Sequence, residues 1–466
     1  MLTRIEIDGF KSFADFELDL PPFLVVLGQN ASGKSNLFDA VQLLRRLVSA
    51  PSLFDAFADM RGELSELFRR YEGGDGVAQA DRMTFAVEVL LEPDVVDPFG
   101  EVVDVSHTRL RYELTIGLHM DPDGFPRARV LTEAARPLLA KEDSWPSRAG
   151  VSKAFKEAKL RYKRTTELLT TGSNSQGNRV FKIAQEGSQG RRRQIPAHSA
   201  EATVLSSITS AAEFPLLFAL RRELESWRFL QLDPAALRQP STQEQRGDVL
   251  SANGANLAKV LRRIERTSRS AYGSGLDDIA AALAKVVRGF AGIEVEENAA
   301  RGQWETYLTT RDEGRVSARV ASDGTLRVLT LLAALHDPDH RGLICFEEPE
   351  NGIYPQRLRE LLGLLSRLVT DPTADSDQDE PLTQLILSSH SPVVLTALEP
   401  ADLVVMDWTT RVSDSAGGRI SRVRRVLPPP AGQQAFAFND LPVMTVAERR
   451  DLPGIDVEEA KRVLES

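Results

Sequence analysis

The chain has 466 residues, of which 57 are Lys or Arg and 67 are Asp or Glu, so its formal net charge is −10. With 42% hydrophobic residues it has room for about two or three units with buried cores, which excludes a disordered or fibrous protein. Its single cysteine excludes an internal disulfide and a cysteine-rich zinc site, and favours a reducing compartment such as the cytoplasm.

The distribution of apolar and basic residues excludes two further classes. No run of about 18 apolar residues and no apolar leader occur, so we expect neither a membrane-spanning helix nor secretion. The acidic balance argues against a surface that is basic throughout, although a local basic surface is compatible with it.

The first predicted elements are two short strands, a buried strand, a loop and a helix. Alternating apolar residues indicate strands near 2–7 and 16–20, and the continuous apolar run 23–27 is typical of a buried parallel strand. A glycine-containing loop, 28–35, follows, and apolar residues from Leu37 to Leu47 then recur at helical spacing.

The middle of the chain predicts an antiparallel sheet followed by helices, and the last third returns to alternating helix and strand. The predicted middle strands are 83–91, 110–116 and 180–183, the helices are 214–227, 256–264 and 276–290, and two more strands are 293–295 and 304–308. In the last third we expect helices at 326–335 and 357–368 and strands at 343–346, 385–387 and 403–406.

Residues Gly28 to Ser35, GQNASGKS, fit the pattern G-x-x-x-x-G-K-[ST] between an apolar strand and an amphipathic helix. In such a loop the glycines let backbone N–H groups turn toward the β- and γ-phosphates of a nucleotide, while Lys34 adds positive charge and the Ser35 hydroxyl binds Mg²⁺. The pattern therefore predicts a phosphate-binding loop rather than a glycine-rich helix cap.

Two acids, Glu347 and Glu348, follow the apolar strand 343–346. A carboxylate at a strand tip beside the phosphate loop can hold the water shell of Mg²⁺, and a second can orient the attacking water. We assign the first role to Glu347 and the second to Glu348, the alternative being an ordinary acidic turn. Cys345 lies inside the strand and is expected to be buried and unreactive.

Two other motifs gain meaning from their order in the chain. His390 follows an apolar strand in Ser388–Pro392 and is placed to sense the γ-phosphate, although a lone histidine there is usually structural. Ser322 and Gly324 open the helix 326–335, where they form an anion site or an ordinary cap with Ser322 or Asp323 as the capping residue.

The order of these motifs resembles that of the ABC-type ATPases of the RecF/SMC class, and most closely the AAA ATPases akin to the overcoming-lysogenization-defect (OLD) proteins. The likeness covers nearly the whole chain and includes residues 5–13, 28–36, 227–234, 254–257 and 347–355. It implies an α/β P-loop NTPase of ABC/RecF type with an antiparallel β subdomain and a helical insertion. The expected parts are an N-terminal ATPase lobe (1–140), a basic and helical insertion (141–315) and a C-terminal ATPase lobe (316–466).

The resemblance also implies ATP hydrolysis with ATP and Mg²⁺ as ligands, and a homodimer stabilised by ATP. In relatives of this kind the residue at Glu348 is the general base and His390 is the switch histidine, while Ser35 and Glu347 bind the metal. Ser322 and Gly324 would complete the nucleotide site of a second protomer. The phosphate-loop residues expected to contact the nucleotide are Gly28, Asn30, Gly33, Lys34, Ser35 and Asn36.

The sequence departs from the family pattern in its signature and in its length. Asp323 replaces the second small residue of a Ser-Gly-Gly signature, and Ala321 replaces the usual leucine before it. The glutamine that relatives place near Mg²⁺ is either Gln231, at a predicted strand end, or Gln79, in a predicted loop. OLD nucleases carry a Toprim domain after the switch histidine, and we expect none in the 76 residues after His390.

Two functions are left open by these motifs. The first is an ATPase of DNA repair or DNA-end metabolism, and the alternative is a regulatory ATPase of a phage-defence or toxin-type system that controls a separately encoded nuclease or toxin. From Lys141 to Ala200 the chain carries 13 basic and 5 acidic residues, which favours DNA if they form one face and is otherwise a solvated surface. The residues expected to share that face are Lys153, Lys156, Lys159, Lys163 and Arg191 to Arg193.

Overall fold

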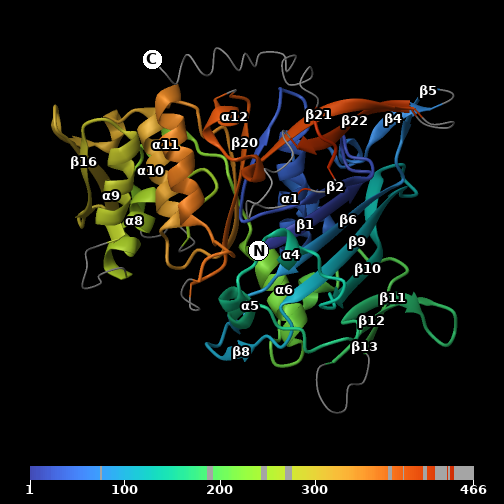
Figure 1. Cartoon of the computed structure of the whole chain (residues 1–466). Coiled ribbons are helices and arrows are strands. Elements are labelled where there is room, and N and C mark those ends of the chain that lie inside the picture. The colour runs from blue at the N-terminus through green and yellow to red at the C-terminus, as the bar shows by residue number, and fades with distance from the viewer. Residues whose placement is uncertain are drawn as a thin grey trace.

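Two large β-sheets organise the chain in the computed structural model (Figure 1). The structure describes residues 1–73, 76–185, 193–242, 249–267, 275–375, 380–391, 393–412, 417–425, 438 and 441–444. Within these residues each large sheet has eight strands, and a smaller sheet and a two-stranded ribbon complete the β-structure. None of the helices in these residues is long and apolar enough to cross a membrane.

The first large sheet is antiparallel and has the order β13-β12-β11-β10-β9-β6-β1-β2. Its strands alternate buried and exposed residues because one face packs on the core, as in β9, where Leu110, Tyr112, Leu114 and Ile116 are buried. The strands are β1 (Leu2–Asp8), β2 (Phe16–Asp19), β6 (Arg82–Leu90), β9 (Arg109–Met120), β10 (Pro126–Pro137), β11 (Leu169–Ser173), β12 (Arg179–Ile183) and β13 (Arg193–Pro196).

The second large sheet has the order β14-β19-β20-β3-β21-β22-β4-β5, and its first five strands are parallel. This mixed architecture, with a parallel sheet beside a separate antiparallel one, confirms the predicted α/β fold class. The strands are β3 (Phe23–Leu27), β4 (Arg70–Gly73), β5 (Gly76–Gln79), β14 (Arg228–Leu230), β19 (Gly342–Glu347), β20 (Thr383–Ser389), β21 (Leu403–Val412) and β22 (Gly417–Arg425).

Strand β3 is wholly apolar because its two faces belong to different cores. Leu24 and Val26 pack in a core with the antiparallel sheet and with helices α1 (Lys34–Ser49) and α6 (Pro215–Ser226). Val25 and Leu27 pack in a second core with α8 (Leu257–Thr267), α9 (Gly275–Val286), α10 (Asp323–Leu335) and α11 (Pro355–Leu365). Figure 1 shows α8 to α11 on one side of β20, and β6, β9 and β10 on the other.

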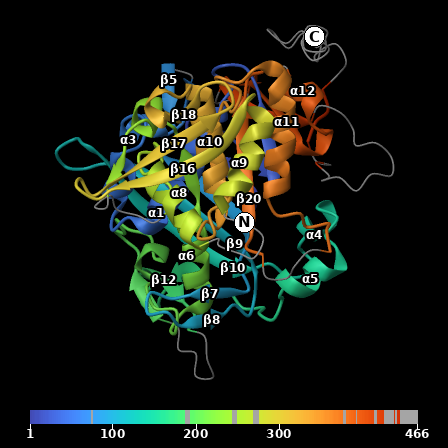
Figure 2. The same ribbon diagram turned by 90° about the vertical axis from the view of Figure 1, so that its left-hand side faces the viewer.

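The smaller elements cover the ends of these layers. Figure 2 shows β16 (Phe290–Asn298) and β17 (Gln303–Thr310) alongside α8 and α9. The remaining strands are β7 (Asp94–Val96), β8 (Val102–Asp104), β15 (Ser241–Thr242) and β18 (Gly314–Ser317). The remaining α-helices are α2 (Leu53–Ala58), α3 (Leu64–Leu67), α4 (Trp145–Arg148), α5 (Lys153–Lys159), α7 (Pro234–Leu237) and α12 (Val394–Ala397), with 3₁₀ turns at Leu205–Ser207, Ala318–Val320, Ser366–Leu368 and Pro400–Asp402.

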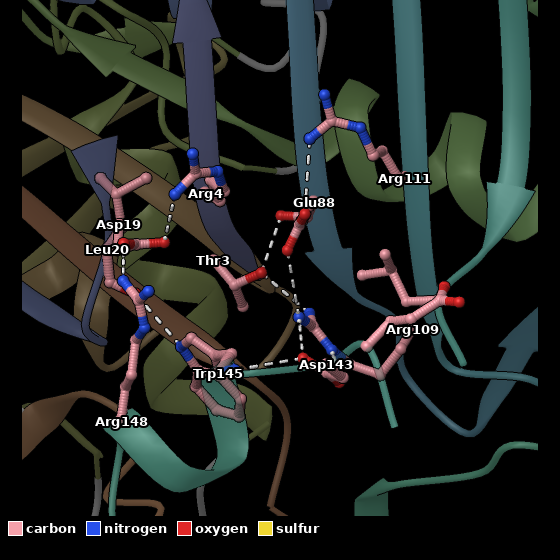
Figure 3. A network of polar contacts seen from close by, with 12 residues as sticks. Thr3, Arg4, Asp19, Leu20, Glu88, Arg109, Arg111, Asp143, Trp145 and Arg148 are labelled. Carbon is pink, nitrogen blue, oxygen red and sulfur yellow. Dashed lines mark hydrogen bonds and ion pairs between the residues drawn. The ribbon is translucent and has the colours of Figure 1, made fainter. Parts of the chain in front are cut away.

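The segment 141–315 contributes to both large sheets, since β11, β12 and β13 extend the antiparallel sheet and β14 joins the parallel one. A buried polar network also ties its beginning to the N-terminal strands (Figure 3). The guanidinium of Arg109 donates to both carboxylate oxygens of Asp143, at 2.7 and 2.9 Å, and to the Thr3 hydroxyl at 2.8 Å. Burial alone would raise the pKa of Asp143, but the hydrogen bond and charge of Arg109 outweigh it and lower that pKa.

One of the basic residues expected to share an exposed face in this segment is buried instead. The prediction that Lys159 lies on an exposed basic face is wrong, because Lys159 is buried. Its ammonium group pairs with Glu92 at 3.3 Å and donates to the Glu380 carbonyl at 2.7 Å. Arg148 pairs with Asp19 (Figure 3), and Arg161 pairs with Asp104 at 2.7 Å. Lys163 lies beyond the end of α5, and Arg191 and Arg192 lie outside the described residues.

Candidate functional site

The phosphate-binding pattern forms the loop between β3 and α1. Gly33 has φ +108°, a left-handed conformation that favours glycine, and a Cβ there would lie 2.1 Å from the Ser421 hydroxyl. A Cβ on Gly28 would lie 2.4 Å from the Met406 carbonyl oxygen. Both glycines are therefore required by the close approach of β21 and β22 to the loop.

Lys34 points back over its own loop, where its ammonium group donates to the carbonyl oxygens of Gly28 at 2.6 Å and Gln29 at 2.8 Å. Burial lowers the pKa of Lys34, and the nearby carboxylates of Glu348, Glu350 and Glu347 act in the opposite direction. The lysine of the loop and the three acids after β19 thus share one electrostatic environment.

Backbone hydrogen bonds join the ends of three parallel strands at this point. The Gly28 amide donates to the Ser389 carbonyl at 3.1 Å, and the Glu348 amide donates to the Ser388 carbonyl at 2.8 Å. In the sheet β20 lies between β3 and β19, so the phosphate loop, the acids and His390 emerge at the same carboxyl edge. This edge is where open α/β sheets bind their ligands.

The two acids that end β19 differ in geometry. Glu347 has a buried carboxylate oxygen, Oε1, with no hydrogen-bond partner in the described part of the chain. Glu348 has φ +52°, a strained conformation for a residue with a side chain, and its Oε2 accepts from Asn351 Nδ2 at 2.6 Å. The unpartnered oxygen of Glu347 and the hydroxyl of Ser35 are hard oxygen donors, so these residues fit a Mg²⁺ ion.

A third acid, Glu350, was missed by the sequence motifs although it stands two residues after Glu348. Its Oε1 accepts from the Ser389 hydroxyl at 2.7 Å and from the His390 amide at 3.0 Å, and its buried Oε2 has no partner in the described residues. The imidazole Nδ1 of His390 lies 3.5 Å from both Glu348 and Glu350. Glu350 therefore positions the switch candidate beside the candidate base.

The signature candidates lie at the start of α10. Ser322 is its N-cap and accepts from the Thr325 amide at 3.2 Å, so the capping role is present. Asp323 pairs with Arg238, which also donates to the Ala321 carbonyl at 3.0 Å. Gly324 packs against Gly352, in the turn that follows the acids. The signature is thus bound within its own chain to α7 and to the acidic turn.

A cavity of about 310 Å³ opens beside the phosphate loop. Asn36, one of the predicted contact residues, lines it and donates to the Ser12 hydroxyl at 2.9 Å. Ser421 lines it from β22 and donates to the Ser32 carbonyl at 2.7 Å. Sequence reasoning missed Ser421 because the signal is a contact between segments almost 400 residues apart. The wall also contains Lys11, Ala31, Glu66, Phe68, Arg70, Trp408, Arg419 and Ile420.

The two glutamines considered for the metal site lie at different ends of the parallel sheet. Gln231 follows β14, which neighbours β19, and the backbone amide of Gln231 donates to the Ala252 carbonyl at 2.8 Å. Gln79 is the last residue of β5, at the far end of the strand order, and not in a loop as expected. Of the two, only Gln231 directly follows a strand that neighbours the one ending in the acids.

Comparisons with known sequences match most of the chain to one family and a short part of it to one curated protein. A protein-family model described as "AAA domain, putative AbiEii toxin, Type IV TA system" matches residues 23–396. The chromosome partition protein Smc of Methanocaldococcus jannaschii is 43% identical over 53 residues, which are 11% of this chain and only 4% of that protein.

Solved structures of Smc head domains also match the chain, with TM-scores below 0.5. An Smc head bound to the C-winged helix domain of ScpA has a TM-score of 0.49 and 14% identity, and the match covers 91% of this chain and 96% of that one. A head domain with an extended coiled coil from Pyrococcus furiosus, bound to the C-terminal domain of ScpA, has a TM-score of 0.42 and 12% identity, with 91% and 95% covered.

The family model spans most of the chain and contains the phosphate loop, the signature, the acids and His390. ATP is the nucleotide of this family, and the P-loop ATPase character that the motif order predicts is confirmed, while the closer likeness to OLD proteins stays a prediction. The chain therefore belongs to the family described as "AAA domain, putative AbiEii toxin, Type IV TA system".

Proposed function

We propose that the protein binds ATP with Mg²⁺ at the carboxyl edge of β3, β19 and β20 and hydrolyses it to ADP and phosphate. One observation carries this proposal: Lys34, Glu348 and His390, from distant parts of the sequence, meet at that edge. Two buried carboxylate oxygens there, Glu347 Oε1 and Glu350 Oε2, have no partner among the described residues. Buried acceptors of this kind are costly unless a ligand satisfies them.

Each residue has a distinct role in the proposed reaction. The amides of the loop from Gly28 to Gly33, including Asn30, and the ammonium of Lys34 bind the phosphates, and Asn36 contacts the nucleotide from α1. Ser35 and Glu347 hold Mg²⁺, which neutralises charge on the phosphate oxygens when bound.

Glu348 is the proposed general base. It orients a water molecule for attack on the γ-phosphorus and takes its proton, while the bond from that phosphorus to the bridging oxygen of ADP breaks. His390, 3.5 Å from Glu348, is proposed to sense the γ-phosphate.

A phosphate-release assay tests hydrolysis directly. We expect the parent protein to release phosphate in the presence of Mg²⁺ and Lys34→Ala to release none. Lys153→Ala is a matched control, because that lysine lies on the surface of α5 with 89% of its side chain exposed. No release by the parent, or equal release by Lys34→Ala, would overturn the proposal.

We also propose that ATP stabilises a homodimer in which Ser322 and Gly324 face the nucleotide of the partner. Exposed apolar side chains flank these motifs, since Val320 is 74% exposed before the signature and Tyr354 is 80% exposed after the acidic turn. Apolar surface of this kind suits an interface. Light scattering on Glu348→Gln tests this, and we expect a dimer with ATP and a monomer without it.

Of the two functions that the sequence leaves open, we favour the regulation of a toxin-type system over DNA repair. The family description names a toxin of a Type IV TA system, which favours the toxin-type alternative, and four cations of the basic stretch are paired with acids. DNA repair stays a prediction. A salt titration of DNA binding by the ATP-trapped Glu348→Gln protein discriminates the two. Affinity that falls steeply with salt would favour DNA, and absence of binding would favour the effector.

A further inference from the structure

A second cavity of about 370 Å³ lies at the opposite edge of the parallel sheet from the phosphate loop. Its wall is formed by the end of α6, by the first residue of β14, by the turn before β19 and by β7. Strand β19 has six residues and runs from this cavity to Glu347, so about 16 to 20 Å separate the two edges. One nucleotide in the phosphate loop does not fill both places.

Two buried nitrogen atoms in this wall lack hydrogen-bond partners in the described residues. They are Nε of Arg228, at the start of β14, and Nε2 of His340, whose residue is only 5% exposed. A buried polar atom without a partner costs about 1–3 kcal/mol, so native structures rarely retain one without a ligand or an ordered water. The Nε–H of Arg228 is always a donor, so it indicates a bound group that accepts hydrogen bonds, and His340 Nε2 can donate to the same group when it carries a proton.

Other cations lie near both residues. Burial lowers the pKa of Arg228 to about 10, the nearby charge of Arg45 acts in the same direction, and the carboxylate of Asp337 acts in the opposite one. Burial lowers the pKa of His340 to about 4, and Arg228 again contributes. Each group would gain from an anion beside it, because an anion stabilises the protonated form.

Most acids in the wall do not supply that anion, since the charges of four of the five are already paired. Four of the five have cationic partners that lie outside the cavity wall: Glu92 with Lys159, Glu223 with the Met1 ammonium, Glu225 with Arg221 and Asp339 with Arg263. Asp94, exposed on β7, is the fifth. No salt bridge within the described residues engages Arg222, Arg228 or Arg341, so cations exceed the free carboxylates.

We propose that this cavity binds a phosphate-bearing anion no larger than a mononucleotide. Arginine guanidinium groups match phosphate oxygens in geometry and charge, and three of them line one wall here. The volume lies at the lower end of the roughly 300–1,000 Å³ typical of small-molecule pockets. The site is independent of ATP hydrolysis and would give the ATPase a second ligand at the other end of β19.

Calorimetric titration with inorganic pyrophosphate tests the proposal in Lys34→Ala protein, where the phosphate loop is disabled. We expect one binding site per chain. Arg341→Ala and Arg222→Ala change exposed residues and should fold normally, and each should weaken binding at least tenfold. Arg228→Gln should abolish it. Arg129→Ala, on the exposed side of β10, is the matched control and should bind as tightly as Lys34→Ala alone.

Three outcomes would each overturn the proposed site. The first is that pyrophosphate does not bind at millimolar concentration, and the second is that Arg341→Ala and Arg222→Ala leave its binding unchanged. The third is that citrate binds equally well, which would exclude a preference for phosphate. The titration contains no ATP and uses a variant without a working phosphate loop. An absence of ATP hydrolysis in the parent protein would therefore overturn the proposed function and leave this result standing.

Discussion

Gly324 and Gly352 meet backbone to backbone, where the first turn of α10 touches the turn that follows β19. A Cβ on Gly324 would lie 2.0 Å from the carbonyl oxygen of Gly352, and a Cβ on Gly352 would lie 2.8 Å from Cα of Gly324. Arg327, one turn along α10, donates to the Glu347 carbonyl at 3.2 Å. The signature helix is therefore fastened to the acids of the candidate site by rigid backbone contacts.

Substitution of Gly324 by alanine should loosen this contact. The added methyl group meets a backbone oxygen that no rotamer can move, so the two turns must separate, and overpacking of this kind typically costs about 1–3 kcal/mol. We expect a lower melting temperature and slower ATP hydrolysis. Gly363→Ala, in α11, is the control, because its methyl group would meet only the Arg367 guanidinium at 3.8 Å. It should stabilise the helix by about 0.5–1 kcal/mol, and equal melting temperatures for the two variants would contradict the prediction.

The pKa of Lys34 predicts how ATP affinity depends on pH. Burial lowers this pKa from 10.5, so the ammonium loses its proton, and its attraction for phosphate, at a lower pH than an exposed lysine. ATP affinity should therefore fall as pH rises, beginning below pH 10.5, and nucleotide titrations between pH 7 and 10 measure the fall. The carboxylate of Glu348 raises the pKa of Lys34, so the fall should occur at lower pH in Glu348→Gln. Identical profiles would show that the two groups are uncoupled.

Glu348→Gln and Glu347→Gln should separate water activation from metal binding. Glutamine at 348 keeps the shape of the side chain but cannot take a proton, so ATP binding should persist while single-turnover hydrolysis slows by about a hundredfold or more. Glutamine at 347 removes charge from a buried side chain that is the proposed metal ligand, so the variant should need more Mg²⁺ for half-maximal activity. The same kinetic defect in both variants would contradict this division of roles.

The central strands and helices could be predicted from the sequence because their apolar patterns are strong. Strand β3 is apolar at every position since it lies between two cores, and α10 carries a dense apolar pattern after its serine cap. Strand β10 was not predicted, although it has 12 residues. A register shift between Val130 and Thr132 breaks its alternation, and Glu133 occupies a fully buried position where an apolar residue would be expected.

Helix ends and site contacts were harder to predict than the motifs. The expected helix 276–290 ends at Val286, because Gly289 adopts φ +76° and Phe290 begins β16. At the site, the motifs identified Lys34, Glu348 and His390, whereas the partners Glu350 and Ser421 are recognised only through contacts made by folding. Local sequence patterns therefore predict the motif residues, whereas the residues that contact them are recognised only in the tertiary structure.

The pair between Arg238 and Asp323 predicts how the altered signature works. Asp323 places a carboxylate, 56% exposed, at the start of α10, where the proposed dimer would bring a partner's γ-phosphate. A lone carboxylate would repel that phosphate, and the guanidinium of Arg238 neutralises it. The same guanidinium donates to the Ala321 carbonyl at 3.0 Å and so holds the residues that precede the helix.

Arg238→Ala in the Glu348→Gln background should therefore weaken the ATP-dependent dimer, because it exposes the charge of Asp323 to phosphate. The double change Arg238→Ala with Asp323→Gly should restore dimerisation, since it removes the repulsive carboxylate along with its partner. Arg301→Ala, on the exposed turn between β16 and β17, is the control and should dimerise like the parent. Sedimentation velocity at several salt concentrations measures the effect, which should be largest at low salt. A double variant no better than Arg238→Ala would show that Arg238 acts through its contact with Ala321, and a dimer unaffected by Arg238→Ala would remove the pair from the proposed interface.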